Sequence, residues 1–128
     1  MNFFSIDLRG TRRFTLCVGP WALKFARSAR GCRCNTFEAD TWKDASPERR
    51  SFLCPVLACL PFGVCLVMSR AVPISEEECR ALKATRGFPD WGYTPGGPES
   101  PLEHKASDWG RLSDGRLVAL DYSAKEDL

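Results

Sequence analysis

Short runs of alternating or continuous apolar residues make up the first part of the chain, and such runs predict β-strands. Three of them come first, at residues 3–8, 14–18 and 21–26. Gly19-Pro20 separates the second run from the third and predicts a hairpin. The first run alternates only weakly, so we expect it at the edge of a sheet. The polar segments 9–13 and 27–35 predict a turn and a loop.

Two later segments predict helices. Asn35, with Glu38 three residues after it, fits a loose capping signature, so we expect a helix to begin at residue 35 or 36. Pro47 marks a break after this helix. Ser75 is a good N-cap, and the three glutamates that follow it complement the positive end of a helix dipole. Gly87 is the expected end of this second helix.

Residues 52–68 carry no charged side chain, which raises the question of a membrane span. The segment falls short of the roughly 18–20 residues that a spanning helix needs. It also contains Pro55, Pro61 and Gly63, which divide it into two apolar halves. Two buried strands joined by a turn at 60–63 are therefore the favoured interpretation, and a membrane-associated segment is the weaker alternative.

The last third of the chain predicts a long loop followed by a hairpin. Residues 88–101 contain four prolines and three glycines, and a loop of that length in a small domain is typical of function or disorder. Asp114-Gly115 lies between apolar flanks and is a strong hairpin signal. A strand is expected at 117–120. The order of elements predicts an α+β fold with an antiparallel N-terminal sheet.

Composition narrows the classes of function. The 128 residues are about one domain's worth, since domains usually run to roughly 100–200 residues. Lysine and arginine exceed aspartate and glutamate by only 18 to 16, so we expect no nucleic acid held mainly by bulk positive charge. The seven cysteines are an odd number, and several lie in apolar runs, as in a reduced protein. Charged residues interrupt any apolar signal segment near the start. These features predict a cytoplasmic protein with no membrane partner.

Five segments, taken in order, resemble the protein-kinase-like superfamily. Trp21-Ala22-Leu23-Lys24 is similar to the strand whose lysine contacts nucleotide phosphates, and Glu38 follows on the next expected helix. Residues 66–71 are similar to the strand and hinge that hold adenine. Glu103 and Asp108 have the spacing of the aspartate and asparagine in the catalytic loop, and Asp121-Tyr122-Ser123 resembles the D-F-G segment.

The resemblance implies a single reduced kinase-like domain over residues 1–128. Residues 1–68 would form an N-lobe-like antiparallel sheet with one helix, and 69–128 a hinge and a shortened C-lobe-like part that ends in a β-hairpin. The implied cofactors are ATP and Mg²⁺. Residues expected to bind the nucleotide are Lys24, Glu38, Met68 and Arg70.

The resemblance also implies roles for three carboxylates. Asp108 and Asp121 would bind Mg²⁺, and Glu103 and Asp121 would be the catalytic residues. Several features depart from the family. Pro101-Leu102-Glu103 stands in place of His-Arg-Asp, no glycine-rich loop precedes Lys24, and only seven residues, 122–128, follow Asp121.

Two functions are compatible with this pattern. One is a pseudokinase-type binding or regulatory module, with an ATP and Mg²⁺ cleft and a protein partner. The alternative is an active minimal phosphotransferase that moves the ATP γ-phosphate to a hydroxyl acceptor. Self-association through the exposed side of the shortened lobe is a further expectation. Small reduced kinase-like chains would suit a phage or another mobile element.

Overall fold

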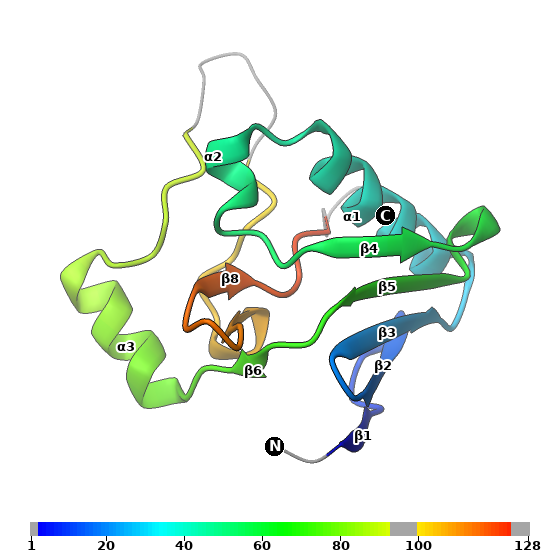
Figure 1. The fold of residues 1–128 in the computed structure, drawn as a ribbon, viewed down its shortest axis with the longest axis horizontal. Coiled ribbons are helices and arrows are strands. Elements are labelled where there is room, and N and C mark those ends of the chain that lie inside the picture. The colour runs from blue at the N-terminus through cyan, green and yellow to red at the C-terminus, as the bar shows by residue number, and fades with distance from the viewer. Residues whose placement is uncertain (1–2, 93–99, 124–128) are drawn as a thin grey trace.

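The computed structural model describes residues 3–92 and 100–123, which form an α+β fold with two antiparallel sheets (Figure 1). The larger sheet has the strand order β1-β2-β3-β5-β4 and the smaller one β6-β7-β8. The larger sheet comprises β1 (Phe4–Asp7), β2 (Arg13–Val18), β3 (Trp21–Ala26), β4 (Val56–Cys59) and β5 (Cys65–Ser69). The smaller sheet comprises β6 (Val72–Pro73), β7 (Trp109–Arg111) and β8 (Leu117–Ala119). The helices are α1 (Ala29–Asp44), α2 (Pro47–Arg50) and α3 (Glu76–Thr85), with short 3₁₀ turns η1 (Pro61–Gly63) and η2 (Ala106–Asp108).

The first three strands confirm the hairpin and the edge strand expected from the sequence. β2 and β3 pair antiparallel, with Val18 opposite Trp21 across the turn. Gly19 lies in that turn with a φ of 55°, a conformation that glycine adopts without steric cost. β1 forms one edge of the sheet and pairs only with β2.

The prediction of a loop at residues 27–35 is wrong, because most of this segment belongs to α1. The helix begins at Ala29, and the Ser28 side chain caps it by accepting a hydrogen bond from the Gly31 amide at 3.3 Å. Asn35 is therefore not a cap but a fully buried residue within the helix. A Cβ at Gly31 would come within 2.2 Å of the Arg12 carbonyl oxygen, so glycine allows this turn of α1 to lie close to the main chain beside β2.

Residues 52–68 contain two strands, as expected. β4 and β5 are joined through η1, where Phe62 and Gly63 both have positive φ angles. β5 lies between β3 and β4 in the larger sheet. Within residues 3–92 and 100–123, no helix has the length and apolar character needed to cross a bilayer. Pro47 does mark the break after α1, and it opens the short helix α2.

The C-terminal part follows the predicted order. The Ser75 side chain caps α3, which ends at Thr85, and Arg86 rather than Gly87 takes the left-handed conformation at its end. The hairpin β7-β8 is present, with Gly115 in its turn at a φ of 88°. Of the expected loop 88–101, residues 93–99 lie outside the described part of the chain.

The two sheets share one hydrophobic core. Its largest fully buried side chains include Trp109 and Tyr122 from the C-terminal part and Leu53, Leu66 and Met68 from the first part. The main chain of residues 52–54 also hydrogen-bonds to Ala119 in both directions, at 2.8 and 2.9 Å. This link holds the end of β8 against the segment that leads into β4.

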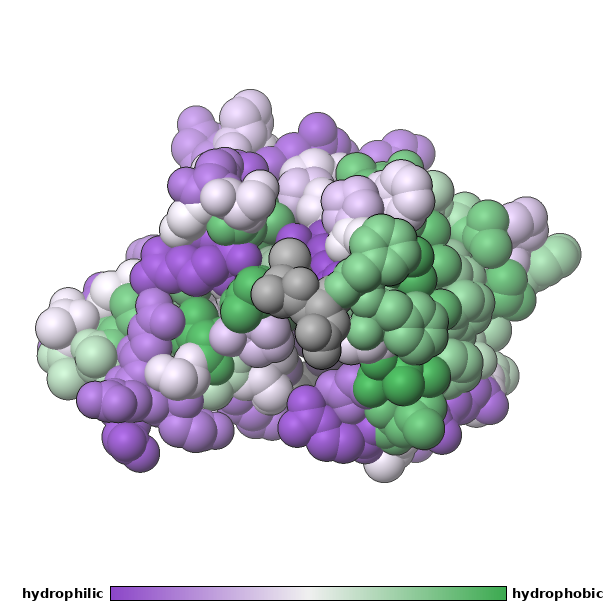
Figure 2. All heavy atoms as spheres, turned by 60° about the horizontal axis from the view of Figure 1, so that its bottom comes forward, coloured by the Kyte–Doolittle hydropathy of each residue, from purple (hydrophilic) through white to green (hydrophobic). Residues whose placement is uncertain are grey.

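The two faces of the larger sheet differ in what covers them. α1 packs against β3, β4 and β5 on the face to which Lys24 points. Side chains alternate along a strand, so the neighbours of Lys24 project to the opposite face. That face carries Phe4, Ile6 and Trp21, each about half exposed. Figure 2 shows hydrophobic residues gathered over the side of the molecule formed by this sheet.

Candidate functional site

Lys24 lies at the centre of a buried ionic cluster. It occupies the middle of β3, where Thr15 of β2 and Leu66 of β5 are its partners in register. Only 10% of its side chain is exposed. Its ammonium group donates to the two carboxylate oxygens of Glu38, at 3.1 and 3.3 Å, and to the Leu120 carbonyl oxygen. The structure thus brings together the lysine and glutamate that the sequence analysis paired.

Glu38 connects the sheet to the segment after β8. Its carboxylate is completely buried in α1 and accepts hydrogen bonds from Lys24, from the Arg13 guanidinium and, at 3.0 Å, from the Tyr122 amide. A buried carboxylate is stable only when charges and donors compensate it, and two cations and an amide do so here. This one side chain therefore fixes α1, β2, β3 and residues 120–122 relative to one another.

Asn35 supports the cluster from one turn earlier in α1. Its side-chain amide donates to the Lys24 carbonyl oxygen at 3.0 Å and to the Gly63 carbonyl oxygen at 2.8 Å. Its own oxygen accepts from the Arg13 guanidinium at 3.0 Å. The residue therefore ties α1 to β3 and to the turn before β5, and holds Arg13 in position.

Asp121 lies at the mouth of the cluster, with 29% of its side chain exposed. One oxygen accepts from the Ser123 amide at 3.2 Å, from the Ser123 hydroxyl at 3.0 Å and from Arg13 at 3.4 Å. Burial favours a raised pKa for this carboxyl group, but the positive charges of Lys24 and Arg13 and the Ser123 hydrogen bonds outweigh it, so the pKa of Asp121 is lowered. Asp121 is therefore ionised at neutral pH.

Arg13 completes the cluster, and only 11% of its side chain is exposed. Burial favours a lower pKa for the guanidinium, but the charges of Glu38 and Asp121 reverse the effect and raise the pKa of Arg13. Arg13 is thus a permanent cation that contacts both carboxylates.

A cleft of about 1260 Å³ opens above this cluster, between the β1–β2 end of the larger sheet and the segments around β6 and β8. Lys24 and Asp121 both line it, so the two groups converge on one hollow. Asp108 and Arg70 line it as well. The Arg70 guanidinium donates to the carbonyl oxygens of Phe3 and Gly19, and the Arg70 backbone amide donates to the Pro20 carbonyl oxygen. These contacts tie the segment after β5 to the β2–β3 turn.

Three of the expected site residues are not among the described residues that line this cleft: Glu38, which is fully buried in the cluster, Met68 and Glu103. Met68 is 1% exposed and belongs to the hydrophobic core beneath the sheet. Glu103 forms an ion pair with Lys105 at 2.8 Å, and its carbonyl oxygen accepts from the Trp109 indole. Neither side chain is among the described residues that line the cleft.

Two residues of the cluster, Arg13 and Asn35, are not predicted from the sequence as site residues. The charged segment 9–13 predicts a turn, whereas Arg13 begins β2. A usable signal was present: Arg13, Thr15 and Cys17 alternate with Phe14, Leu16 and Val18, which places Arg13 on the same face as the register partner of Lys24. Asn35 gave no comparable signal, because its role depends on a helix that begins earlier than expected.

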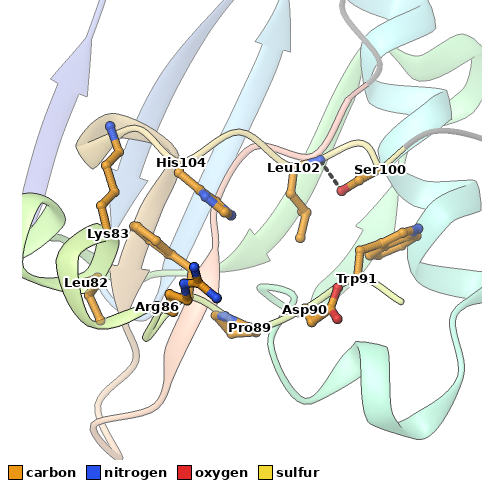
Figure 3. Close-up of a pocket in the computed structure, with 10 residues that line it drawn as sticks. Leu82, Lys83, Arg86, Pro89, Asp90, Trp91, Ser100, Leu102 and His104 are labelled. Carbon is orange, nitrogen blue, oxygen red and sulfur yellow. Dashed lines mark hydrogen bonds between the residues drawn. The ribbon is translucent and has the colours of Figure 1, made fainter. Parts of the chain in front are cut away.

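A second, smaller hollow of about 540 Å³ lies between the end of α3 and residues 100–104 (Figure 3). Phe88 stacks on His104 there, with ring centroids 4.4 Å apart. Figure 3 shows Lys83 and Arg86 of the α3 end on one side and Trp91 on the other. None of the site residues expected from the sequence lines it.

Comparisons of this chain with protein-family models, with curated proteins and with solved structures find no match.

Proposed function

We propose that this chain is a reduced kinase-like protein whose cleft binds a nucleoside triphosphate, and that it acts as a pseudokinase-type binding or regulatory module. The observation that carries the proposal is the convergence of Lys24 and Asp121 on one cleft, with Glu38 holding the lysine at 3.1 Å. In protein kinases a strand lysine paired with a helix glutamate contacts the phosphates, and the aspartate of D-F-G lies opposite.

The surrounding fold supports the same interpretation. The resemblance implied an antiparallel sheet with one helix, then a hinge, then a shortened part ending in a hairpin. The larger sheet with α1, the segment from Ser69 to Val72 and the hairpin β7-β8 correspond to these parts in order. Lys24 comes from β3 and Glu38 from α1, which is the origin that the resemblance requires.

Binding is favoured over catalysis by the position of Glu103. A phosphotransferase needs a carboxylate that orients the acceptor hydroxyl beside the transferred phosphate. Glu103 was the expected group, and its carboxylate instead pairs with Lys105 away from the described lining of the cleft. The phosphotransferase alternative rests on Asp108 and Asp121, which do line the cleft, and transfer of labelled γ-phosphate that Asp121→Ala abolishes would favour it.

The arrangement of Asp121 fits a bound Mg²⁺ poorly. Mg²⁺ in nucleotide sites uses one or two carboxylates together with phosphate oxygens. One carboxylate oxygen of Asp121 already accepts three hydrogen bonds, one of them from the cationic Arg13. A divalent ion at Asp121 would meet the positive charge of that guanidinium at close range. We therefore propose that protein side chains, and not a bound Mg²⁺, hold the phosphate groups.

The test is a thermal melt with and without ATP. Ligand that binds only the folded state raises stability by RT ln(1 + [L]/Kd), about 1.4 kcal/mol at ten times Kd. For a chain of this size that is a rise in Tm of roughly 5 °C. We expect the rise with wild-type protein and its loss in Lys24→Ala, each measured against the variant's own Tm without ATP.

Leu23→Ala is the matched control, because Leu23 neighbours Lys24 on β3 and projects to the opposite face. It is expected to lower the Tm of the free protein but to keep the full ATP-induced rise. Tripolyphosphate alone separates recognition of the nucleoside from recognition of phosphate. The absence of any rise with ATP at millimolar concentration would contradict the proposal.

A further inference from the structure

Arg13 bridges the two carboxylates of the cluster. Its guanidinium contacts Glu38 on one side and Asp121, at 3.4 Å, on the other. Asn35 holds it from α1 at 3.0 Å. A planar guanidinium with several donors suits bridging contacts to carboxylate and phosphate oxygens. The residue is therefore fixed in place before any ligand arrives.

The charge of the described cleft lining is suited to a polyanion. Its basic residues outnumber its acidic ones, five to three. The basic residues are Arg9, Arg12, Arg13, Lys24 and Arg70, and the acidic ones are Asp7, Asp108 and Asp121. Arg9 and Asp7 pair with each other at 2.9 Å, so they contribute little net charge. The remaining lining is positive without any added ion.

Asp121 on its own would repel a polyphosphate. In protein kinases the divalent ion removes that repulsion by bridging the aspartate and the phosphates. Here Arg13 contacts both Asp121 and Glu38, and Lys24 contacts Glu38, so the two cations offset the two carboxylates. The cluster therefore presents no net negative charge to a phosphate group, and no metal is needed to remove repulsion by Asp121.

We propose that Arg13 takes the place of Mg²⁺ in this cleft, so that the protein binds the triphosphate of a metal-free nucleotide. The inference rests on the proposed function and adds to it the form of the nucleotide that is bound. Wild-type protein binds ATP in EDTA at least as tightly as it binds ATP with excess Mg²⁺, because the added ion would be repelled by Arg13.

The experiment is isothermal titration of the full chain with ATP, once in EDTA and once in excess MgCl₂. We expect the Kd in EDTA to equal or fall below the Kd in MgCl₂. Binding only in MgCl₂ would overturn the role of Arg13 and leave the proposed function standing. Binding in neither buffer would overturn the proposed function itself, so the two failures are distinguishable.

Arg13→Gln sharpens the test. Loss of one charge-assisted contact weakens ATP binding in EDTA at least about tenfold. The same variant should recover affinity in MgCl₂, because Asp121 then lacks its guanidinium partner. Equal affinity of Arg13→Gln and wild type in EDTA would overturn the proposal. ATP binding by Arg13→Gln but not by wild type would also overturn the proposal, because it would mean that Arg13 closes the cleft.

Arg27→Gln is the matched control. It removes one arginine from the end of the same hairpin, where the guanidinium lies 5.5 Å from the Phe14 ring centroid and donates to the Leu8 carbonyl oxygen. Arg27 is exposed and is not among the described residues that line the cleft. We expect this variant to bind ATP as wild type does in both buffers. The circular dichroism and Tm of each free variant establish that it is folded.

Discussion

The two faces of the larger sheet carry different kinds of side chain, although the same strands form both. The face covered by α1 carries Arg13 and Lys24, whose charges are compensated by buried hydrogen bonds to Glu38. The other face carries apolar side chains, and Phe4 and Trp21 on it are 56% and 49% exposed. In most one-sided antiparallel sheets the apolar face is the buried one. Here the covered face encloses the charged residues Arg13 and Lys24 together with apolar ones such as Leu66, while the other face leaves large apolar side chains exposed.

The difference indicates that the side chains of the covered face contribute most to the stability of this fold. On the covered face Arg13, Lys24 and Glu38 each have several defined partners, so a single substitution removes several interactions at once. On the exposed face a side chain such as Phe4 contributes little, because much of its surface still contacts water. Substitutions on the covered face should therefore cost more stability than substitutions on the exposed face.

Glu38→Ala is expected to have the largest effect. It leaves Lys24 and Arg13 without their shared carboxylate in a buried site and frees the Tyr122 amide. Breaking a buried ion pair by removing one partner costs about 3–5 kcal/mol. Urea denaturation should show a large drop in the midpoint.

Glu77→Ala is the control for that substitution, because Glu77 is an exposed carboxylate in the first turn of α3. Its free energy of unfolding should change by no more than about 0.5 kcal/mol. If Glu38→Ala were as mild as Glu77→Ala, the ionic cluster would not hold the covered face together.

Asp121 is expected to make stability depend on pH in the acid range. The charged groups that act on it directly are Arg13 of β2 and Lys24 of β3; Glu38 of α1 shares Arg13 with it, and Asp108 of η2 lines the same cleft. Its pKa in the folded protein lies below its ordinary value of 3.8, so the folded state binds its proton less readily than the unfolded state. The stabilisation is therefore complete above that ordinary value and is lost as the pH falls through the folded pKa.

Asp121→Asn measures this contribution. At neutral pH the variant should be less stable than wild type by about 1 kcal/mol, and the gap should close on acidification. Urea midpoints of both proteins between about pH 3 and about pH 7 give the comparison. A gap that stays constant or widens toward low pH would mean that the carboxylate is not stabilised by its cationic neighbours.

Phe4→Ser is expected to have the smallest effect. Phe4 lies on the edge strand β1 and is 56% exposed, so the free energy of unfolding should change by about 0.5 kcal/mol or less. Leu66→Ala provides the contrast, because Leu66 is fully buried on the covered face and its truncation should cost about 2–5 kcal/mol. Similar losses from both substitutions would show that the apolar face is covered in solution.

Most of the fold was predictable because local signals agreed with the final structure. Gly19-Pro20 and Asp114-Gly115 mark real hairpin turns, and Ser75 does cap α3. α1 was placed too late because residues 29–34 have small and polar side chains that are typical of a loop. Their helical conformation depends on close packing of Gly31 against β2 and on the Ser28 cap, which the sequence pattern did not identify.

The candidate site was predictable only in part. Lys24, Glu38 and Asp121 were found through the resemblance, and the structure brings them together. Arg13 was missed because a charged residue at a strand start is usually solvated, and its burial depends on α1 and on the segment after β8 folding over it. Glu103 was chosen by its spacing from Asp108, but spacing does not determine which way a loop side chain points.

The most direct test of the account is a titration of methyl-labelled protein with ATP, followed by two-dimensional NMR. Thr15, Ala71 and Leu120 line the cleft, whereas Leu16, Leu23 and Val67 lie on the opposite face of the sheet. The account predicts saturable shifts in the methyl signals of the first set and none in the second. Unchanged spectra, or shifts confined to the apolar face or to the smaller hollow around Leu82 and Leu102, would contradict it.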